Sequence, residues 1–181
     1  AHKHLLLNDT NHRVKNHLKT ASALLYASRQ RAADEGSREA LDTAISQLQV
    51  LARVYDRLQL REGATTVDAS EFIQALAVDL RATILSRRMI VLRCSADRCL
   101  LDSSHAVLLG LAINELVTNA LKYAFPNARD GEIEISLRLD GDSMRLEVID
   151  NGVGISPEAI AGRGRRLVLS FAHELGGMVD W

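Results

Sequence analysis

Apolar and small residues recur at steps of three and four along two stretches of the first 61 residues. The first of these stretches begins with one step of seven, from Leu7 to Val14. The first stretch contains Leu7, Val14, Leu18, Ala21, Leu25 and Ser28, and the second contains Leu41, Ala44, Leu48, Leu51, Tyr55 and Leu58. Between them lie Gly36 and two candidate helix N-caps, Asp34 and Ser37. The pattern predicts a hairpin of two helices, each with one apolar seam of the coiled-coil kind.

A lone pair of helices buries little of such a seam. We therefore expect residues 5–61 to pack against a second copy of the chain, which gives a homodimer built around a four-helix bundle.

The pattern changes after residue 63. Asp68, followed three positions later by Glu71, predicts a capped helix that runs to about residue 86. Residues 89–96 are rich in β-formers, whereas residues 103–125 are apolar almost all round and predict a long buried helix, capped near its first residue.

Residues 131–139 and 143–150 alternate with period two around an Asp-Gly-Asp turn, which predicts a β-hairpin. A last helix is expected at about residues 165–175, ending at Gly176 and Gly177. The sequence thus predicts an α+β chain, in which a helical domain at 1–63 precedes an α/β sandwich with helices on one face at 64–181.

The composition is that of an ordinary soluble protein, with 47% apolar and 25% charged residues. A net charge of −1 argues against general nucleic-acid binding. Since no signal-peptide pattern and no uninterrupted apolar run of membrane length occur, we expect a cytoplasmic segment without membrane contact. Cys94 and Cys99 lack both a disulfide framework and a zinc spacing.

Three polar residues interrupt the long apolar helix. Glu115, Asn119 and Lys122 stand at positions i, i+4 and i+7, and therefore on one stripe of a regular helix. The stripe is either a polar cluster that satisfies itself, or the exposed edge of the helix, or a site for an anionic ligand with a cation. In a ligand site, Glu115 orients water, Asn119 binds Mg²⁺ through its amide oxygen, and Lys122 meets phosphate.

Asp150 is the last residue of the second strand of the hairpin. It lies an even number of positions from the apolar residues Met144, Leu146 and Val148, so its side chain is expected on the same face of the strand, towards the helices. A carboxylate there can accept a hydrogen bond from an exocyclic amine such as that of adenine. Gly152 and Gly154 follow and let the backbone approach a flat ring. Gly162 and Gly164 precede the last helix, whose N-terminal amides are suited to phosphates.

The order of these motifs resembles the Bergerat ATP-binding fold of histidine kinases, gyrase, Hsp90 and MutL. NELVTNALKYAF resembles its N-box, DNGVG its first glycine box, and GRGRRLV a modified second one. With NHRVKN near the N-terminus, the chain resembles bacterial sensor histidine kinases whose phosphoacceptor motif is HRxxN. The related HWE kinases fit less well, because Asn114 replaces their N-box histidine and no tryptophan lies beside the first glycine box.

The resemblance implies a role for each motif residue. His12 is the phosphoacceptor, Glu115 the N-box acid, Asn119 the Mg²⁺ ligand and Asp150 the adenine anchor. The implied nucleotide contacts are Lys122, Tyr123, Gly152, Gly154, Gly162 and Gly164. His17 matches no family position and is interpreted as an ordinary helix histidine.

Helical spacing adds two residues to this set. Asp9 and Asn16 lie three positions before and four after His12, beside the seam. Asp9 is suited to hold the proton of one ring nitrogen, which leaves the other nitrogen free to attack phosphate. Asn16 is suited to position a water for hydrolysis of a regulator's acyl phosphate.

Three features depart from the family pattern. Arg163 and Arg165 stand in the second glycine box where leucines are usual, and they either add phosphate contacts or mark a remodelled lid. Seven residues separate Gly154 from Gly162, which predicts a short lid. The chain ends where the family continues into one or two further strands, so we expect those strands to be absent.

The expected function is therefore ATP-dependent autophosphorylation of His12, followed by transfer to an aspartate in the receiver domain of a response regulator. A sensor domain is expected N-terminal to this segment. The alternative is a phosphotransfer protein or regulator phosphatase with a degenerate ATP domain. A third possibility, an anti-sigma serine kinase, leaves the N-terminal hairpin and His12 unexplained.

Overall fold

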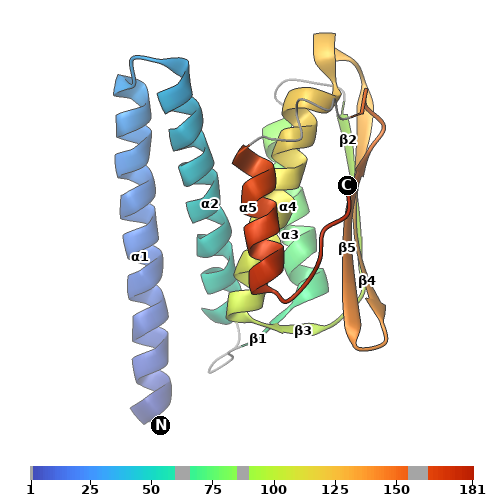
Figure 1. The fold of residues 1–181 in the computed structure, drawn as a ribbon. Coiled ribbons are helices and arrows are strands. Elements are labelled where there is room, and N and C mark those ends of the chain that lie inside the picture. Colours follow the sequence, from blue (N-terminus) through green and yellow to red (C-terminus); the bar gives the residue numbers. More distant parts are fainter. Residues whose placement is uncertain (1, 60–65, 85–89, 155–162) are drawn as a thin grey trace. The chain divides into compact units, whose positions relative to one another are not determined.

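The computed structural model of the chain describes residues 2–59, 66–84, 90–154 and 163–181 (Figure 1). Side chains of residues 2–13, 15, 57–59, 83, 84, 128 and 163 also lie outside the description. The chain divides into two compact units, Ala1–Val67 and Asp68–Trp181, and each is described by itself. The predicted domain boundary between residues 63 and 64 falls outside the described residues.

The first unit is a hairpin of α1 (His2–Arg31) and α2 (Glu35–Gln59). Asp34 caps α2, because its carboxylate accepts the backbone N–H of Ser37 at 2.7 Å and the Ser37 hydroxyl at 2.6 Å. Of the two predicted N-caps, Asp34 therefore fills that position.

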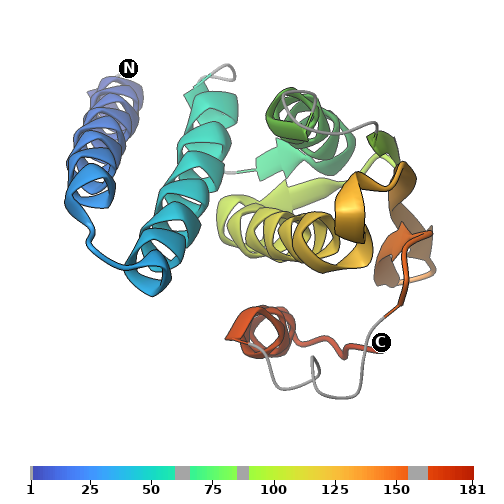
Figure 2. The same ribbon diagram turned by 90° about the horizontal axis from the view of Figure 1, so that it is seen from above.

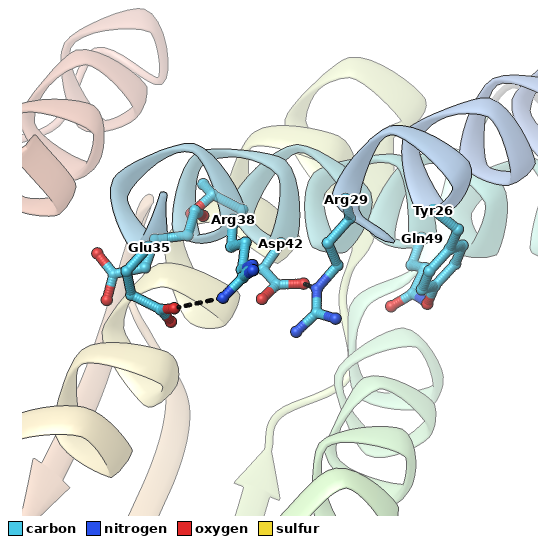
Figure 3. Close-up of polar contacts among 8 residues, drawn as sticks. Tyr26, Arg29, Glu35, Arg38, Asp42 and Gln49 are labelled. Atoms are coloured by element: carbon cyan, nitrogen blue, oxygen red, sulfur yellow. Dashed lines mark hydrogen bonds and ion pairs between the residues drawn. The ribbon is translucent and has the colours of Figure 1, made fainter. Parts of the chain in front are cut away.

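Two polar contacts join α1 to α2 near the turn (Figure 3). The side-chain amide of Gln49 donates to the Tyr26 hydroxyl at 3.2 Å, and Arg29 forms an ion pair with Asp42. Contacts of this kind fix how far one helix is shifted along the other.

The seam residues of the hairpin that the structure describes are half-buried, except Ser28, which is exposed. Among the described side chains of α2, those of Ile45, Val50 and Val54 are buried, and each lies one position from a predicted seam residue. The apolar side of α2 is therefore wider than the predicted seam.

The second unit contains a three-stranded sheet in the order β2 (Ile90–Ala96), β4 (Gly131–Asp140), β5 (Ser143–Asp150). β2 pairs with β4 in parallel, and β4 pairs with β5 as the predicted antiparallel hairpin. A small sheet joins β1 (Thr66–Asp68) to β3 (Leu100–Asp102).

The helical segments of this unit are α3 (Ala69–Ile84), α4 (Ser103–Asn119), the π-helical turn η1 (Ala120–Ala124), the 3₁₀ turn η2 (Pro126–Ala128) and α5 (Arg163–Glu174). Figures 1 and 2 show α3 and α4 on the same face of the sheet. The predicted layer arrangement is thus present.

The core of this unit follows the pleat of β4. Ile133, Ile135 and Leu137 are fully buried, whereas Glu134 and Arg138 between and after them are exposed. The helices supply the other half of the core, through Phe72, Ile73, Ile113 and Val117.

Two of the predicted helix ends are confirmed. The backbone N–H of Glu71 donates to the Asp68 carboxylate at 3.1 Å and caps α3. Gly176 has a φ of +70°, and the N–H of Gly177 donates to the carbonyl of Ala172 at 2.8 Å, which closes the end of α5. For α4, Asp102 occupies the N-cap position but makes no side-chain capping hydrogen bond.

Ser103–Ala124 is, among the described residues, long and apolar enough to cross a membrane by length and composition alone. Of its apolar window, 56% is buried inside the protein. Its apolar character is therefore explained by its place in the core.

Candidate functional site

The polar stripe lies where α4 changes its geometry. Glu115 is buried, with 7% of its surface exposed, and Asn119 is half-buried. The π-helical turn η1 begins directly after Asn119, and Lys122 and Tyr123 within it are exposed. The stripe was predicted for a regular helix, and beyond Asn119 the helix is not regular, because a π-turn holds more residues per turn. Such turns are frequent at functional sites.

Gly164, in the first turn of α5, lies against this stripe. A Cβ atom at Gly164 would lie 2.7 Å from Nδ2 and 3.2 Å from Oδ1 of Asn119, and 3.3 Å from Oε2 of Glu115. Any larger residue at this position would displace the Asn119 amide, so glycine lets α5 approach the amide and the carboxylate without moving them.

Asp150 ends β5 on the predicted face of the sheet. Its partner across the ladder is the fully buried Ile133, and side chains that are directly opposite in a ladder share a face. The Asp150 side chain is nevertheless exposed, and its Oδ1 accepts the N–H of Gly152 at 3.0 Å. It therefore lies at the open end of the core face.

The loop after Asp150 is held on two sides. On one side, Asn151 Oδ1 accepts the backbone N–H of Glu132 at 2.8 Å. On the other, Val153 donates its N–H to the carbonyl of Ala124 at 2.9 Å. The loop is thus fastened both to β4 and to the end of η1.

Gly152 is the closest point of this contact. A Cβ there would lie 2.3 Å from the carbonyl oxygen of Ala124, a distance that real side chains do not show. Gly154 has a φ of +78° but open space around it, so conformation and not crowding favours glycine at that position.

We expect Gly152→Ala to destabilise the second unit by about 2 kcal/mol, because the added methyl group must push the backbone of Ala124 away. Gly177→Ala is the matched control, since its Cβ would meet the Ala172 carbonyl at an ordinary 3.6 Å. Thermal and urea unfolding of both variants check this, and equal stability of the two would contradict it.

The described residues bring together three of the motifs. Gly164 lies close to α4 at Glu115 and Asn119, and the loop after Asp150 is hydrogen-bonded to the same helical segment at Ala124. At 1.5 Å per residue these contacts lie within about 13 Å along the helix. Side-chain oxygens, a helix N-terminus and a strand-end carboxylate thus lie along one helical segment, an arrangement that suits a ligand with phosphates and an amine.

The other predicted site residues lie on α1 or outside the description. α1 is continuous, so Asp9, His12 and Asn16 stand at the predicted helical spacing, although the side chains of Asp9 and His12 are not described. Asn16 and His17 are exposed. Gly162 and the predicted lid before it lie outside the described residues.

The burial of two polar residues was not predicted from the sequence. Asn114, which directly precedes Glu115, is 5% exposed. The sequence pattern placed it in an apolar helix and assigned no role to its amide. Arg165 is 9% exposed although it belongs to a basic run that normally indicates a solvated surface. No local pattern distinguishes a buried arginine from its exposed neighbour.

Comparison with known families covers most of the chain. Residues 9–84 match a family described as histidine kinase. Residues 104–178 match the histidine kinase-, DNA gyrase B- and HSP90-like ATPases. The chain therefore has a histidine phosphoacceptor domain followed by an ATPase domain of this kind, as the motifs predicted.

Curated relatives and a solved structure agree with this. The sensor histidine kinase PdtaS of Mycobacterium tuberculosis is 30% identical over 154 residues, which cover 84% of this chain and 30% of the relative. Blue-light-activated histidine kinase 2 of Erythrobacter litoralis is 26% identical over 96% of this chain and 52% of its own length. The chain thus spans a third to a half of these curated relatives.

The histidine kinase domain of the blue-light-activated kinase from Erythrobacter litoralis EL346 shares the fold. Its TM-score is 0.69 at 22% identity, over 99% of this chain and 88% of that one. The predicted fold class, a helical hairpin followed by a Bergerat-type α/β domain, is thereby confirmed.

Proposed function

We propose that this chain, which belongs by its two domains to the sensor histidine kinases, transfers the γ-phosphoryl group of ATP to His12 and then to an aspartate of a response regulator. The observation that carries the proposal is the close approach of Gly164 to Asn119 and Glu115. That approach sets the N-terminus of a helix, which favours phosphate, beside two oxygen-bearing side chains.

The nucleotide lies, in this proposal, between α4, the end of β5 and the first turn of α5. Asp150 accepts a hydrogen bond from the adenine amine, since its carboxylate stands at the open end of the core face. Lys122 and Tyr123 are exposed on η1 and are suited to reach the phosphates. Gly154 and, outside the described residues, Gly162 are the remaining predicted nucleotide contacts.

Asn119 is suited to hold Mg²⁺, because its amide oxygen lies near Glu115 in the space that a side chain at Gly164 would fill. In the described parts of the chain no three His, Cys, Asp or Glu side chains gather, so the remaining ligands would be phosphate oxygens and water. When bound, the cation neutralises phosphate charge and aligns the γ-phosphoryl group.

His12 is the nucleophile. One ring nitrogen forms a bond to the γ-phosphorus while the bond to the β–γ bridging oxygen breaks, and ADP leaves with that electron pair. Asp9, one turn before His12, holds the proton of the other ring nitrogen and stabilises the positive charge that the ring acquires. Glu115 is the candidate to orient a water molecule at the nucleotide.

Residues 5–61 are proposed to form the homodimer. Leu24 and Tyr26 on α1 are 66% and 47% exposed in the single chain, and the described seam is half-buried. A four-helix interface of about 1,600 Å² would cover them. We expect light scattering at tens of micromolar to give the mass of two chains, and a strict monomer would contradict the interface.

The remaining partners follow from the family. A histidine kinase implies a response regulator, and the greater length of the curated relatives supports a sensor domain outside this segment. The kinase core is proposed to act in the cytoplasm, where ATP and the receiver domain are found.

Incubation with Mg²⁺ and ATP labelled at the γ-phosphorus tests the function. We expect acid-labile label on the chain, which a receiver domain then removes. Binding of an ATP analogue without any labelling would favour instead a phosphotransfer protein or phosphatase with a degenerate ATP domain. The replacement of the usual leucines of the second glycine box by Arg163 and Arg165 is what leaves this alternative open.

A further inference from the structure

Arg165 is the buried cation of the second unit for which the described residues provide no hydrogen-bond acceptor. It lies in the first turn of α5, with 9% of its surface exposed. Its Nε and Nη1 atoms are covered and make no hydrogen bond to any described residue. Its guanidinium carbon lies 3.8 Å from the centre of the Trp181 ring.

The contact with Trp181 does not compensate the free-energy cost of burying the charged guanidinium of Arg165. A guanidinium group does not lose its proton in proteins, so burial cannot be relieved by deprotonation. The face of an indole ring attracts the positive charge but does not accept the in-plane N–H groups of the guanidinium. The group therefore lacks an anion, and leaving its N–H donors unpaired is costly.

The position of Arg165 identifies the anion. The preceding residue, Gly164, is in contact range of Asn119 and Glu115, so the first turn of α5 borders the nucleotide site. The helix N-terminus and the guanidinium add their positive charges at the same place. Val168, one turn further, is also buried, which shows that Arg165 lies on the inward side of α5.

The chain end holds this side chain in place. After α5 ends at Glu174, the chain turns back at Gly176 and reaches the first turn of the helix through Trp181 (Figure 1). Stacking fixes the plane of the guanidinium, and Nη2, which is not among its covered atoms, is the nitrogen that a ligand can reach. Arg165 is thus oriented before any ligand binds.

We propose that Arg165 is a phosphate-binding residue of the nucleotide site, positioned by its stacking on Trp181. This rests on the proposed ATP binding and adds a ligand contact to it. The anion is the polyphosphate of the nucleotide, which a planar guanidinium binds through charge-assisted hydrogen bonds.

Trp181 provides a direct readout, because it is the one tryptophan of the sequence. We expect ATP to change its fluorescence, excited at 295 nm, in the unaltered chain. In Arg165→Met this response should disappear and the affinity for ATP should fall by roughly tenfold to a hundredfold. Arg166→Met, which removes the same charge from the exposed neighbour, should keep both the response and the affinity within about twofold.

Adenosine separates phosphate binding from packing, since it carries no phosphate. It should bind Arg165→Met and the unaltered chain equally. Thermal unfolding without nucleotide should show Arg165→Met at least as stable as the unaltered chain, because an unpaired buried charge is removed. If Arg165→Met does not fold, Arg165→Lys is the second variant. It should bind ATP more weakly than the unaltered chain and Arg166→Met do, but more tightly than the unaltered chain binds adenosine.

Unchanged ATP affinity in Arg165→Met would overturn the proposal, as would an equal loss of ATP and adenosine. In either case the unaltered chain still binds ATP, and the proposed kinase function stands. Absence of ATP binding by the unaltered chain itself would instead refute the nucleotide site as a whole, and Arg165 with it.

Discussion

Asn119→Ala is expected to lower the rate of labelling from Mg²⁺-ATP by at least about a hundredfold, because it removes the proposed oxygen ligand of the cation. The amide and the Glu115 carboxylate both lie close to Gly164 in the first turn of α5. The measurement is single-turnover labelling as a function of Mg²⁺ concentration.

Two variants separate loss of the ligand from loss of structure. Asn119→Asp keeps an oxygen at the position and should recover part of the rate at high Mg²⁺ concentration. Gln74→Ala removes an exposed side-chain amide from α3 in the same unit and should label normally. Labelling of Asn119→Ala at the unaltered rate and with the unaltered Mg²⁺ dependence would defeat the metal-ligand assignment.

The parts of this site that sequence reasoning predicted are those fixed by local spacing. The parity of Asp150 follows from the period of a strand, and the cap formed by Asp68 follows from the positions of a helix start. Both depend on residues fewer than ten positions apart.

The features that were missed depend on contacts between distant residues. The π-turn at Ala120–Ala124 ends at a carbonyl that accepts the N–H of Val153, and no helical periodicity within the N-box indicates that contact. The burial of Arg165 likewise depends on Trp181 and on the chain reversal at Gly176. Such contacts are set by tertiary packing, which overrides local preference.

His12→Gln is expected to abolish acid-labile labelling, whereas His17→Gln should label within about twofold of the unaltered chain. On the continuous helix α1, His17 is rotated by about 140° from His12 at about 100° per residue. A single bound ATP can therefore face one of them. Asp9 lies one turn before His12 but two turns before His17, so the carboxylate that sets the tautomer serves His12.

His17→Gln is the matched control, because it removes an exposed imidazole from the same helix. Label that persists in His12→Gln and disappears in His17→Gln would reverse the assignment.

Asn16, exposed one turn beyond His12, tests the return reaction, because an amide orients water without competing as a nucleophile. Asn16→Ala should keep autophosphorylation within a fewfold and lose most dephosphorylation of the regulator's aspartyl phosphate. Normal dephosphorylation by that variant would remove the phosphatase role from Asn16 and leave the role of His12 unchanged.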